Sequence, residues 1–309
     1  MKMYRHLKTF LAALTALLCC TTASAYDFIV DGIYYNIISS ENKLVEITHN
    51  GNKMKSYGGE VFIVPEYVEY RGDNYTVTKI GDYAFNQCDF KEIILSNTIT
   101  HIGYYSLSLC QNLTSINIPS SVTNIGVGAF SCCSGLTELF IPKTVQKINY
   151  SYSEGPFEGL SGLDKIVVEE ENPYYDSRGN CNAVIETKTN TLIGGCVNTV
   201  IPNSVTTISG CPFFKNKRLN HISIPNSVTT IEDFSFAGSS LKSVTIGNGV
   251  THIERDAFSC ADLRVIINNS SLKFTIGSGD YGEIAKYAKY IITTENRNDF
   301  DITQDITVP

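Results

Sequence analysis

The residues whose types and spacing could do chemistry begin with Gly277-Ser278-Gly279-Asp280-Tyr281-Gly282, a G-x-G-x-x-G sequence. In dinucleotide-binding folds these glycines let the backbone approach a pyrophosphate between a strand and a helix, and an extended stretch, residues 273–276, comes just before. A doubly wound sheet needs several more strands, but only 27 residues follow Gly282. We therefore interpret this sequence as a loop and expect no cofactor.

Histidine and serine motifs of hydrolases are missing. The sequence contains no H-E-x-x-H and no G-x-S-x-G. His101 and His252 occupy one slot of a repeat in which other units carry Lys, Asn or Thr, which indicates a solvated face. The acidic tail, with Asp299, Asp301 and Asp305, lacks the glycine and the last glutamate of a calcium loop. We expect neither an enzyme nor a metal site.

The elements that position all these residues are internal repeats. A unit that reads approximately T-x-I-G-x-x-A-F returns with its isoleucine at Ile80, Ile102, Ile125, Ile148, Ile208, Ile231 and Ile253. The spacings between these aligned isoleucines are 22, 23, 23, 60, 23 and 22 residues. A fixed period in the twenties is the mark of a leucine-rich-repeat solenoid. The sequence predicts a mainly β, right-handed coil of stacked 22–23-residue rungs.

Each rung should contain a short strand and a turn. Ile116-Asn117-Ile118 alternates with period two, so one strand face is predicted to be buried, and Pro119 then ends the pairing. About eight inward apolar residues, worth roughly 2 kcal/mol each, cannot offset the backbone entropy of one rung. A rung is therefore stable only when stacked on its neighbours.

Most cysteines fall at fixed places in the repeat. Cys88, Cys110 and Cys133 lie eight residues after their aligned isoleucines, while Cys132 and Cys260 lie seven after theirs. Rungs about 4.8 Å apart would permit disulfides in an exported protein, whereas small buried thiols are ordinary core residues. We favour buried thiols and keep disulfides as the alternative; a zinc site is disfavoured because no C-x-x-C occurs.

The chain divides into five expected parts. Residues 1–25 are a signal peptide, with basic Lys2, Arg5 and Lys8, an apolar stretch and Ala23-Ser24-Ala25. Residues 26–75 form an N-terminal β cap, and residues 76–267 the solenoid, interrupted at about 172–196 by an inserted hairpin. Residues 268–292 form a C-terminal cap with a short helix over 283–292, and residues 293–309 a tail.

The net charge and the hydropathy of the chain argue against a nucleic-acid partner and against a transmembrane segment. Loss of three of the 24 basic residues with the signal peptide leaves 21 against 31 acidic residues, a net charge of −10. Such a surface repels polyanions, so no nucleic-acid partner is expected. No later apolar run is long enough for a transmembrane helix. The protein should be exported to the periplasm, the cell surface or the medium.

The repeat unit I-G-x-x-A-F-x-x-C…L-x-x-I-x-I-P-x-S-V resembles the BspA-like leucine-rich-repeat family of bacterial surface and secreted proteins. Residues 172–180, N-P-Y-Y-D-S-R-G-N, resemble an insertion common in that family, and residues 26–35 its N-terminal cap. Gly155-Pro156-Phe157 and Gly247 depart from the A-F and proline positions. The resemblance implies non-enzymatic protein binding or adhesion, with host or extracellular-matrix proteins as partners.

The candidate binding residues point outward from successive strands or belong to the insertion. On the strands, exposed apolar groups flanked by charges suit protein binding. The insertion is a second candidate because loops on rigid scaffolds often carry recognition. The residues are Glu92, Ile94, Asn117, Glu138, Phe140, Lys165, Val167, His221, Tyr174, Tyr175 and Arg178.

Two other functions compete with protein binding. The 18 tyrosines could stack on sugars in a carbohydrate-binding surface protein, although the chain has no tryptophan. An accessory domain of a secreted enzyme system is the other alternative.

Overall fold

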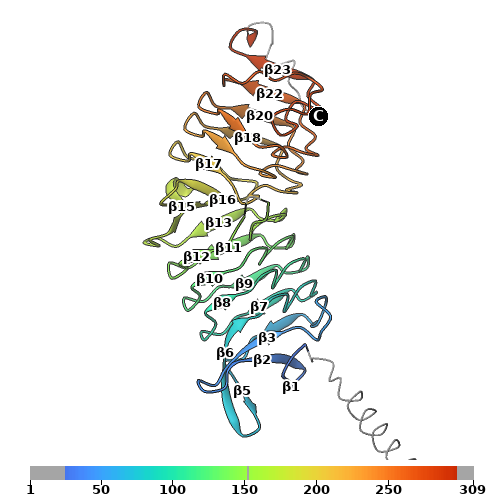
Figure 1. The fold of residues 1–309 in the computed structure, drawn as a ribbon, viewed down its shortest axis with the longest axis vertical. Coiled ribbons are helices and arrows are strands. Elements are labelled where there is room, and N and C mark those ends of the chain that lie inside the picture. The colour runs from blue at the N-terminus through green and yellow to red at the C-terminus, as the bar shows by residue number, and fades with distance from the viewer. Residues whose placement is uncertain (1–24, 152, 298–309) are drawn as a thin grey trace, which may run out of the picture.

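The computed structural model describes residues 25–151 and 153–297. The predicted signal peptide, except Ala25, and the aspartates of the acidic tail lie outside this part. The described chain winds into an elongated stack of rungs, with the N-terminal strands at one end and β23 at the other (Figure 1). This confirms the predicted solenoid.

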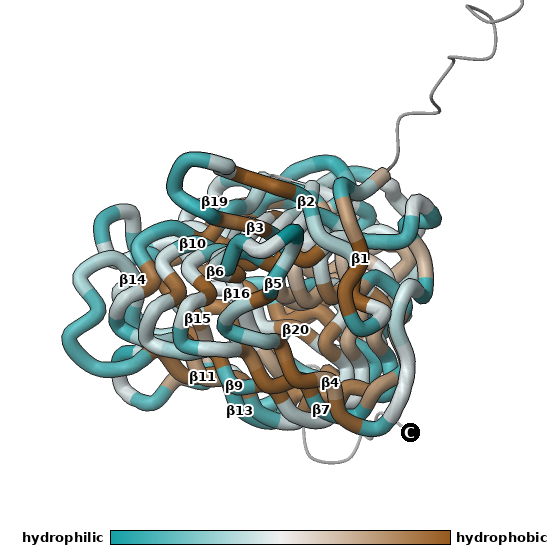
Figure 2. The backbone as a smooth tube through the Cα atoms, turned by 90° about the horizontal axis from the view of Figure 1, so that it is seen from below, coloured by the Kyte–Doolittle hydropathy of each residue, from teal (hydrophilic) through white to brown (hydrophobic). Residues whose placement is uncertain are grey.

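Two rows of strands run along opposite sides of the stack, as an end-on view shows (Figure 2). Each row is divided into shorter hydrogen-bonded sheets but is called one sheet below. The strands that precede the proline slot form the first sheet: β4 (Val61–Ile63), β7 (Glu92–Ile94), β9 (Ser115–Asn117), β11 (Glu138–Ile141), β13 (Lys165–Val168), β18 (His221–Ile224), β20 (Ser243–Ile246), β22 (Val265–Asn268) and β23 (Tyr290–Thr293). The strands with the aligned isoleucines form the second sheet: β6 (Asp73–Ile80), β8 (His101–Ile102), β10 (Asn124–Ile125), β12 (Lys147–Ile148), β17 (Thr207–Ile208), β19 (Thr230–Ile231) and β21 (His252–Ile253).

The repeated threonine and glycine join one rung to the next. The hydroxyl of Thr100 donates to the carbonyl of Thr78 over 3.0 Å, and Thr123 donates in turn to Thr100 over 3.3 Å. A Cβ on Gly103 would lie 2.7 Å from the carbonyl oxygen of Ile80, closer than atoms approach. Close parallel stacking thus accounts for the glycine of the T-x-I-G motif at this rung.

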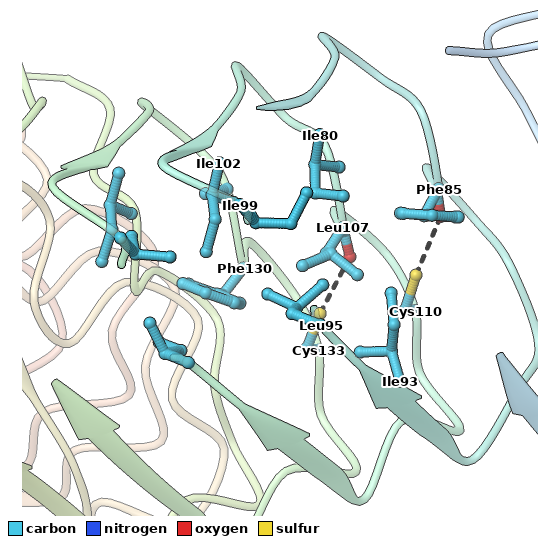
Figure 3. Packing of buried hydrophobic residues seen from close by; sticks show 14 of the residues in the cluster. Ile80, Phe85, Ile93, Leu95, Ile99, Ile102, Leu107, Cys110, Phe130 and Cys133 are labelled. Carbon is cyan, nitrogen blue, oxygen red and sulfur yellow. Dashed lines mark hydrogen bonds between the residues drawn. The ribbon is translucent and has the colours of Figure 1, made fainter. Parts of the chain in front are cut away.

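The core lies between the two sheets (Figure 3). The aligned isoleucines Ile80 and Ile102 are 0% and 1% exposed. The thiol of Cys110 donates to the carbonyl of Phe85 over 2.9 Å, and that of Cys133 to the carbonyl of Leu107 over 3.0 Å. None of the eight cysteines of the described chain forms a disulfide. The repeated cysteine thus fills the core and bonds a carbonyl of the preceding rung.

The N-terminal end is closed by antiparallel strands. β1 (Phe28–Val30), β2 (Ile33–Ser39) and β3 (Leu44–Thr48) pair in that order, and β3 then pairs in parallel with β6. β5 (Tyr67–Tyr70) forms a hairpin with β6. Phe28 stacks on Tyr35 and Tyr70 at ring-centroid distances of 5.1 and 4.0 Å, so aromatic rings cover the first rung.

The insertion forms a layer inside the stack. It comprises β14 (Tyr175–Asp176), a short 3₁₀ helix (Arg178–Asn180), β15 (Ala183–Glu186) and β16 (Thr191–Gly195). These strands are antiparallel, and β16 then pairs in parallel with β17. Val184 and Ile193 join the N-terminal core, whereas Ile185 and Leu192 join the C-terminal core. The hairpin therefore connects two hydrophobic cores.

The helix predicted over residues 283–292 is wrong. Residues 281–287 form turns, and Tyr290–Thr293 is strand β23, paired in parallel with β22. Ile284, Ala285 and Ala288 have helical spacing, yet they are the buried residues of one more rung turn, in the region of the A-F and cysteine slots. Turn residues followed by a strand can imitate a short amphipathic helix. The G-x-G-x-x-G sequence lies in the turns before this rung.

Candidate functional site

The outward residues of the first sheet form two parallel columns. Register pairs Val61 with Glu92 and Glu92 with Ser115 in the first column, which Glu138 and Lys165 continue at the same strand position beyond. The second column contains Ile63, Ile94, Asn117, Phe140 and Val167. Ile63, Ile94 and Phe140 are 64%, 39% and 52% exposed. A mostly apolar column thus runs beside a mostly polar one.

Val61 and Ile63 are members of these columns that sequence reasoning missed. The sequence pattern predicts that their strand belongs to the N-terminal cap. The signal was present, because Pro65 follows the strand two residues after Ile63, near the place where the repeat carries its proline. The outward ladder therefore begins one rung earlier than predicted.

The first sheet is interrupted between β13 and β18, where the insertion lies, and also between β9 and β11. In the preceding rung, the N–H groups of Thr114 and Ser115 donate to the carbonyl of Lys91 over 2.8 and 3.3 Å. In the following rung, Asp164 and Lys165 donate in the same way to Thr137. Within the described residues, Thr137 and Glu138 make no such bonds to Thr114. The facing edges of β9 and β11 thus lack the backbone bonds made by their neighbours.

A groove of ≈490 Å³ opens at this interruption. Ile116 and Leu139 lie in it, and Phe140, Lys165 and Val167 line its far side. Ile116 is only half-buried, although Ile93 and Ile166 at the same strand position are fully buried. The groove therefore offers apolar side chains beside peptide groups that have no partner across the break.

Charge and polar groups flank the apolar column. Glu138 and Lys165 lie opposite each other on β11 and β13, and both are exposed. Asn117 is also outward, but its amide oxygen accepts from Leu95 N–H over 2.8 Å and its Nδ2 donates to the Leu95 carbonyl over 3.1 Å. The Asn117 side chain therefore supplies hydrogen bonds to the backbone of the preceding rung, as a neighbouring strand would. Its amide is less available to a partner than its exposure suggests.

The three insertion residues have different environments. Tyr174 is 46% exposed, whereas Tyr175 is 4% exposed and its hydroxyl accepts from Ile148 N–H over 2.8 Å. Arg178 donates from Nε and Nη2 to the two carboxylate oxygens of Asp176, over 2.7 and 2.6 Å, and from Nη1 to Asn190 and Ser204. Of the three, only Tyr174 presents a large side chain without these structural bonds.

His221 lies on the same face in the C-terminal half. Its Nδ1 is 2.9 Å from the hydroxyl of Ser243 on the next strand. It lines a separate groove of ≈600 Å³ together with Ser223 and the exposed Val200. The structure therefore brings Glu138, Phe140, Lys165 and Val167 together at one groove and places His221 at another.

Metal ligands, membrane-spanning helices and reactive thiols are the other features that could support a function in the described chain. No cluster of three or more His, Cys, Asp or Glu side chains there could hold a metal ion. None of its helices is long and apolar enough to cross a membrane. Burial raises the pKa of the Cys88 thiol to about 12 and that of Cys181 to about 11, so these thiols are protonated at neutral pH.

Comparison with known proteins gives one family and several similar folds. The profile of the BspA type leucine rich repeat region matches residues 73–177 and 194–297 in six copies. The gap between the two matches falls on the inserted hairpin. A search of curated protein sequences found no match.

Among solved structures, the chain is similar to the pneumococcal vaccine antigen PcpA, with 14% identity, a TM-score of 0.53, and coverage of 86% of this chain and 87% of that one. A leucine-rich-repeat protein from Bacteroides ovatus is 21% identical, with a TM-score of 0.49 and coverage of 87% and 79%. A leucine rich cell surface protein from Faecalibacterium prausnitzii is 18% identical, with a TM-score of 0.47 and coverage of 90% and 97%. At these identities, the likeness to PcpA shows the fold alone.

Proposed function

Because the chain belongs to the BspA-type leucine-rich-repeat family, we propose that it is an exported, non-enzymatic module that binds a protein through the first-sheet groove. The observation that carries the proposal is the groove at the β9–β11 interruption, with half-exposed Phe140 on its rim. Host or extracellular-matrix proteins are the proposed partners.

The groove has the composition of a protein-binding hot spot. Phe140 and Val167 supply an apolar centre, and Glu138 and Lys165 place opposite charges directly beside it. Binding energy in protein interfaces concentrates in a few such anchors surrounded by polar groups. A partner can bury the apolar pair while orienting itself on the two charges.

The edges of β9 and β11 add a second source of affinity. Thr137 and Glu138 have N–H groups that make no bond to the preceding rung, so a partner's polar groups can approach them. Stacked rungs hold these groups in a fixed geometry, which reduces the entropy lost on binding. The insertion extends the proposed surface, since a groove of ≈380 Å³ beside Asn172 and Arg178 shares Val167 with the first-sheet groove.

Export and surface display are part of the proposal. The N-terminal pattern of a signal peptide supports export. The similar fold of PcpA belongs to a protein described as a vaccine antigen, a description that suits exposure on a cell.

The test measures retention on a panel of immobilised matrix proteins: fibronectin, fibrinogen, laminin and collagen. Phe140→Asp puts a charge into the apolar centre. It should lower the affinity for the matrix protein that binds wild type at least tenfold, about 1.4 kcal/mol or more. Ile276→Asp is the matched control, because Ile276 is 55% exposed in a distant loop. Equal retention of both variants would remove the groove from the proposal, and no retention of wild type by the panel would remove this partner class.

A further inference from the structure

The first sheet has an open edge at the N-terminal end of the solenoid. Its first strand, β4, pairs with β7 on one side and with no strand on the other within the described chain. The N-terminal cap does not close this edge, because β3 of the cap pairs with β6 of the second sheet. Unpaired edges are the places where sheets add further strands. The edge of β4 is therefore a candidate surface for strand pairing.

The backbone groups of Val61 and Ile63 point to this open side. In a parallel pair, alternate residues of a strand bond to the same neighbour. The carbonyl of Glu60 accepts from the rung of β7 over 3.1 Å, and Val64 N–H donates to that rung over 2.9 Å. Val61 and Ile63 alternate with these bonded residues and so face away from β7. Among residues 25–151 and 153–297 nothing bonds to their peptide groups on that side.

The side chains of β4 are also less covered than those of the next strand. Val61 and Ile63, which point outward, are 48% and 64% exposed. Phe62 points inward but is only half-buried, whereas Ile93 at the same position of β7 is 0% exposed. Ile93 is covered by β9 on its far side, and Phe62 has no such neighbour. A strand placed beside β4 would therefore complete the burial of Phe62.

The opposite end of the first sheet is closed by a side chain. Tyr290 N–H donates to the carbonyl of Arg264, so Ile291 and Thr293 of β23 face the outer side. There the amide of Asn296 takes the place of a further strand. Its Nδ2 donates to the carbonyl of Ile291 over 3.0 Å, and its Oδ1 accepts from Thr293 N–H over 2.7 Å. The edge of β23 is therefore already bonded, whereas that of β4 is not.

The sequence beyond the described chain contains the pattern of a first-sheet strand. Residues 306–309 read I-T-V-P, two apolar residues separated by a polar one and followed by proline. Residues 222–225, I-S-I-P, have the same order, and the first three belong to β18. Residues 62–65, F-I-V-P, have proline in the same place, and their first and third side chains point inward in β4 and just after it. The segment 306–309 thus carries two apolar side chains at the spacing of Phe62 and Val64.

This segment is too short a distance from β23 to reach β4 of its own chain. The nine strands that the described chain places in the first sheet make at least eight rung spacings, roughly 38 Å at about 4.8 Å each, with β4 and β23 at opposite ends (Figure 1). The chain from Arg297 to Ile306 spans at most roughly 32 Å when fully extended. An open β4 edge within reach must therefore belong to another molecule.

We propose that residues 306–309 of one copy add to the open edge of β4 in a second copy as a parallel strand. Ile306 lies beside Phe62 and Val308 beside Val64, so these apolar side chains are buried together. The main-chain groups on the free edge of β4 gain partners, which is the source of affinity in strand addition. Because the two surfaces lie at opposite ends of the molecule, the contact is head-to-tail and repeats without closing. It is independent of the proposed matrix-protein site, since the first-sheet groove lies between β9 and β11.

Sedimentation velocity on the purified protein tests the contact. Wild type should form chains whose mean length grows with concentration and does not stop at a dimer. Ile306→Asp puts a charge where the added strand meets the core, and Val61→Pro removes a peptide N–H of the open edge without removing a bond to β7. Each variant alone should associate roughly tenfold more weakly or less than that. Ile276→Asp and Phe140→Asp change exposed apolar residues elsewhere and should associate like wild type.

A mixture of the two weakened variants gives a sharper readout. Ile306→Asp keeps the open edge and Val61→Pro keeps the donor segment, so an equimolar mixture should form one-to-one dimers that cannot extend. A variant that had merely lost its fold would not restore association in this way. Wild type that stays monomeric, a mixture that does not dimerise, or chains that persist in Val61→Pro would overturn the proposal. A lower melting temperature of Ile306→Asp in dilute, monomeric protein would also overturn it, because the segment would then belong to its own stack.

Discussion

The backbone N–H of Ile148 donates to the side-chain hydroxyl of Tyr175 over 2.8 Å, and both residues are buried. Ile148 belongs to β12, the last strand of the N-terminal segment of the second sheet. No parallel strand pairs with β12 on its far side in the described chain. The tyrosine hydroxyl thus satisfies a peptide group that the next rung would bond in a regular stack.

Tyr175→Phe should therefore destabilise the protein although it removes one atom. The buried N–H of Ile148 would lose its acceptor, at a cost of about 1–3 kcal/mol. Urea unfolding followed by circular dichroism measures the change. Tyr174→Phe is the control, since its side chain is 46% exposed and the expected change is within about 0.5 kcal/mol. Equal midpoints for both variants would contradict the role of Tyr175.

Most of the fold was predictable because the repeat makes it redundant. The slots of Ile80, Phe85 and Cys88 recur, and each recurrence supports the same inward direction. The prediction of a C-terminal helix was wrong because this redundancy is missing there. Residues 283–292 carry too little of the repeat motif to be recognised, and the spacing of Ile284, Ala285 and Ala288 fits a helix equally well.

The sequence predicted which side chains of the candidate site point outward, but not which of them are free to bind a partner. The period-two alternation placed Phe140 and Glu138 outward, as the strand register has them. The bonds of Asn117 to Leu95 and of Arg178 to Asp176 depend on where neighbouring rungs lie. The interruption between β9 and β11 has no counterpart in the motif, so no sequence pattern pointed to the groove.

The thiols should react in the order of their exposure. Cys260 is exposed, whereas Cys88 is 1% exposed and burial raises its pKa to about 12. At pH 8 iodoacetamide should modify Cys260 in the folded protein and leave Cys88, Cys110 and Cys133 unmodified. Mass spectrometry of peptides gives the extent at each cysteine.

Unfolding in urea without reductant then separates thiols from disulfides. All three repeat cysteines should become modified, because each is a free thiol in the structure. Cysteines that stay unmodified in urea but react after reduction would show that disulfides form in the exported protein.

Glu158 should make stability depend on pH. Burial chiefly raises the pKa of this carboxyl, while the hydroxyl of Ser131, which donates to it over 2.7 Å, acts in the lowering direction. A carboxyl with a raised folded-state pKa contributes stability below its ordinary pKa and loses it as pH rises through the folded value. The folded protein should therefore lose part of its stability above the ordinary glutamate range.

Glu158→Gln keeps an acceptor for Ser131 but carries no charge. Its melting temperature should exceed that of wild type by an amount that grows from pH 4 to pH 8. Glu170→Gln is the control, since Glu170 is exposed and should give a gap that does not change with pH. A constant difference between Glu158→Gln and wild type across this range would rule out the titration of Glu158.

Gly194 and Gly195 of the inserted hairpin allow the two cores to meet. A Cβ on Gly194 would lie 2.6 Å from Cδ2 of Phe157, and one on Gly195 would lie 2.5 Å from Cε1 of Phe213. Phe157 belongs to the N-terminal core and Phe213 to the C-terminal core, and both rings are fully enclosed. A methyl group at either glycine must displace a ring that has no free space.

Gly195→Ala should therefore destabilise the protein by about 1–3 kcal/mol, the usual cost of overpacking a core. Gly279→Ala is the matched control, because its Cβ would meet nothing within 4 Å. Because the hairpin links the two halves, Gly195→Ala should also separate their unfolding into two transitions in calorimetry, as expected when one interface of a repeat protein is weakened. A single transition at the wild-type temperature would mean that the contact of Gly195 with Phe213 does not carry the coupling between the two cores.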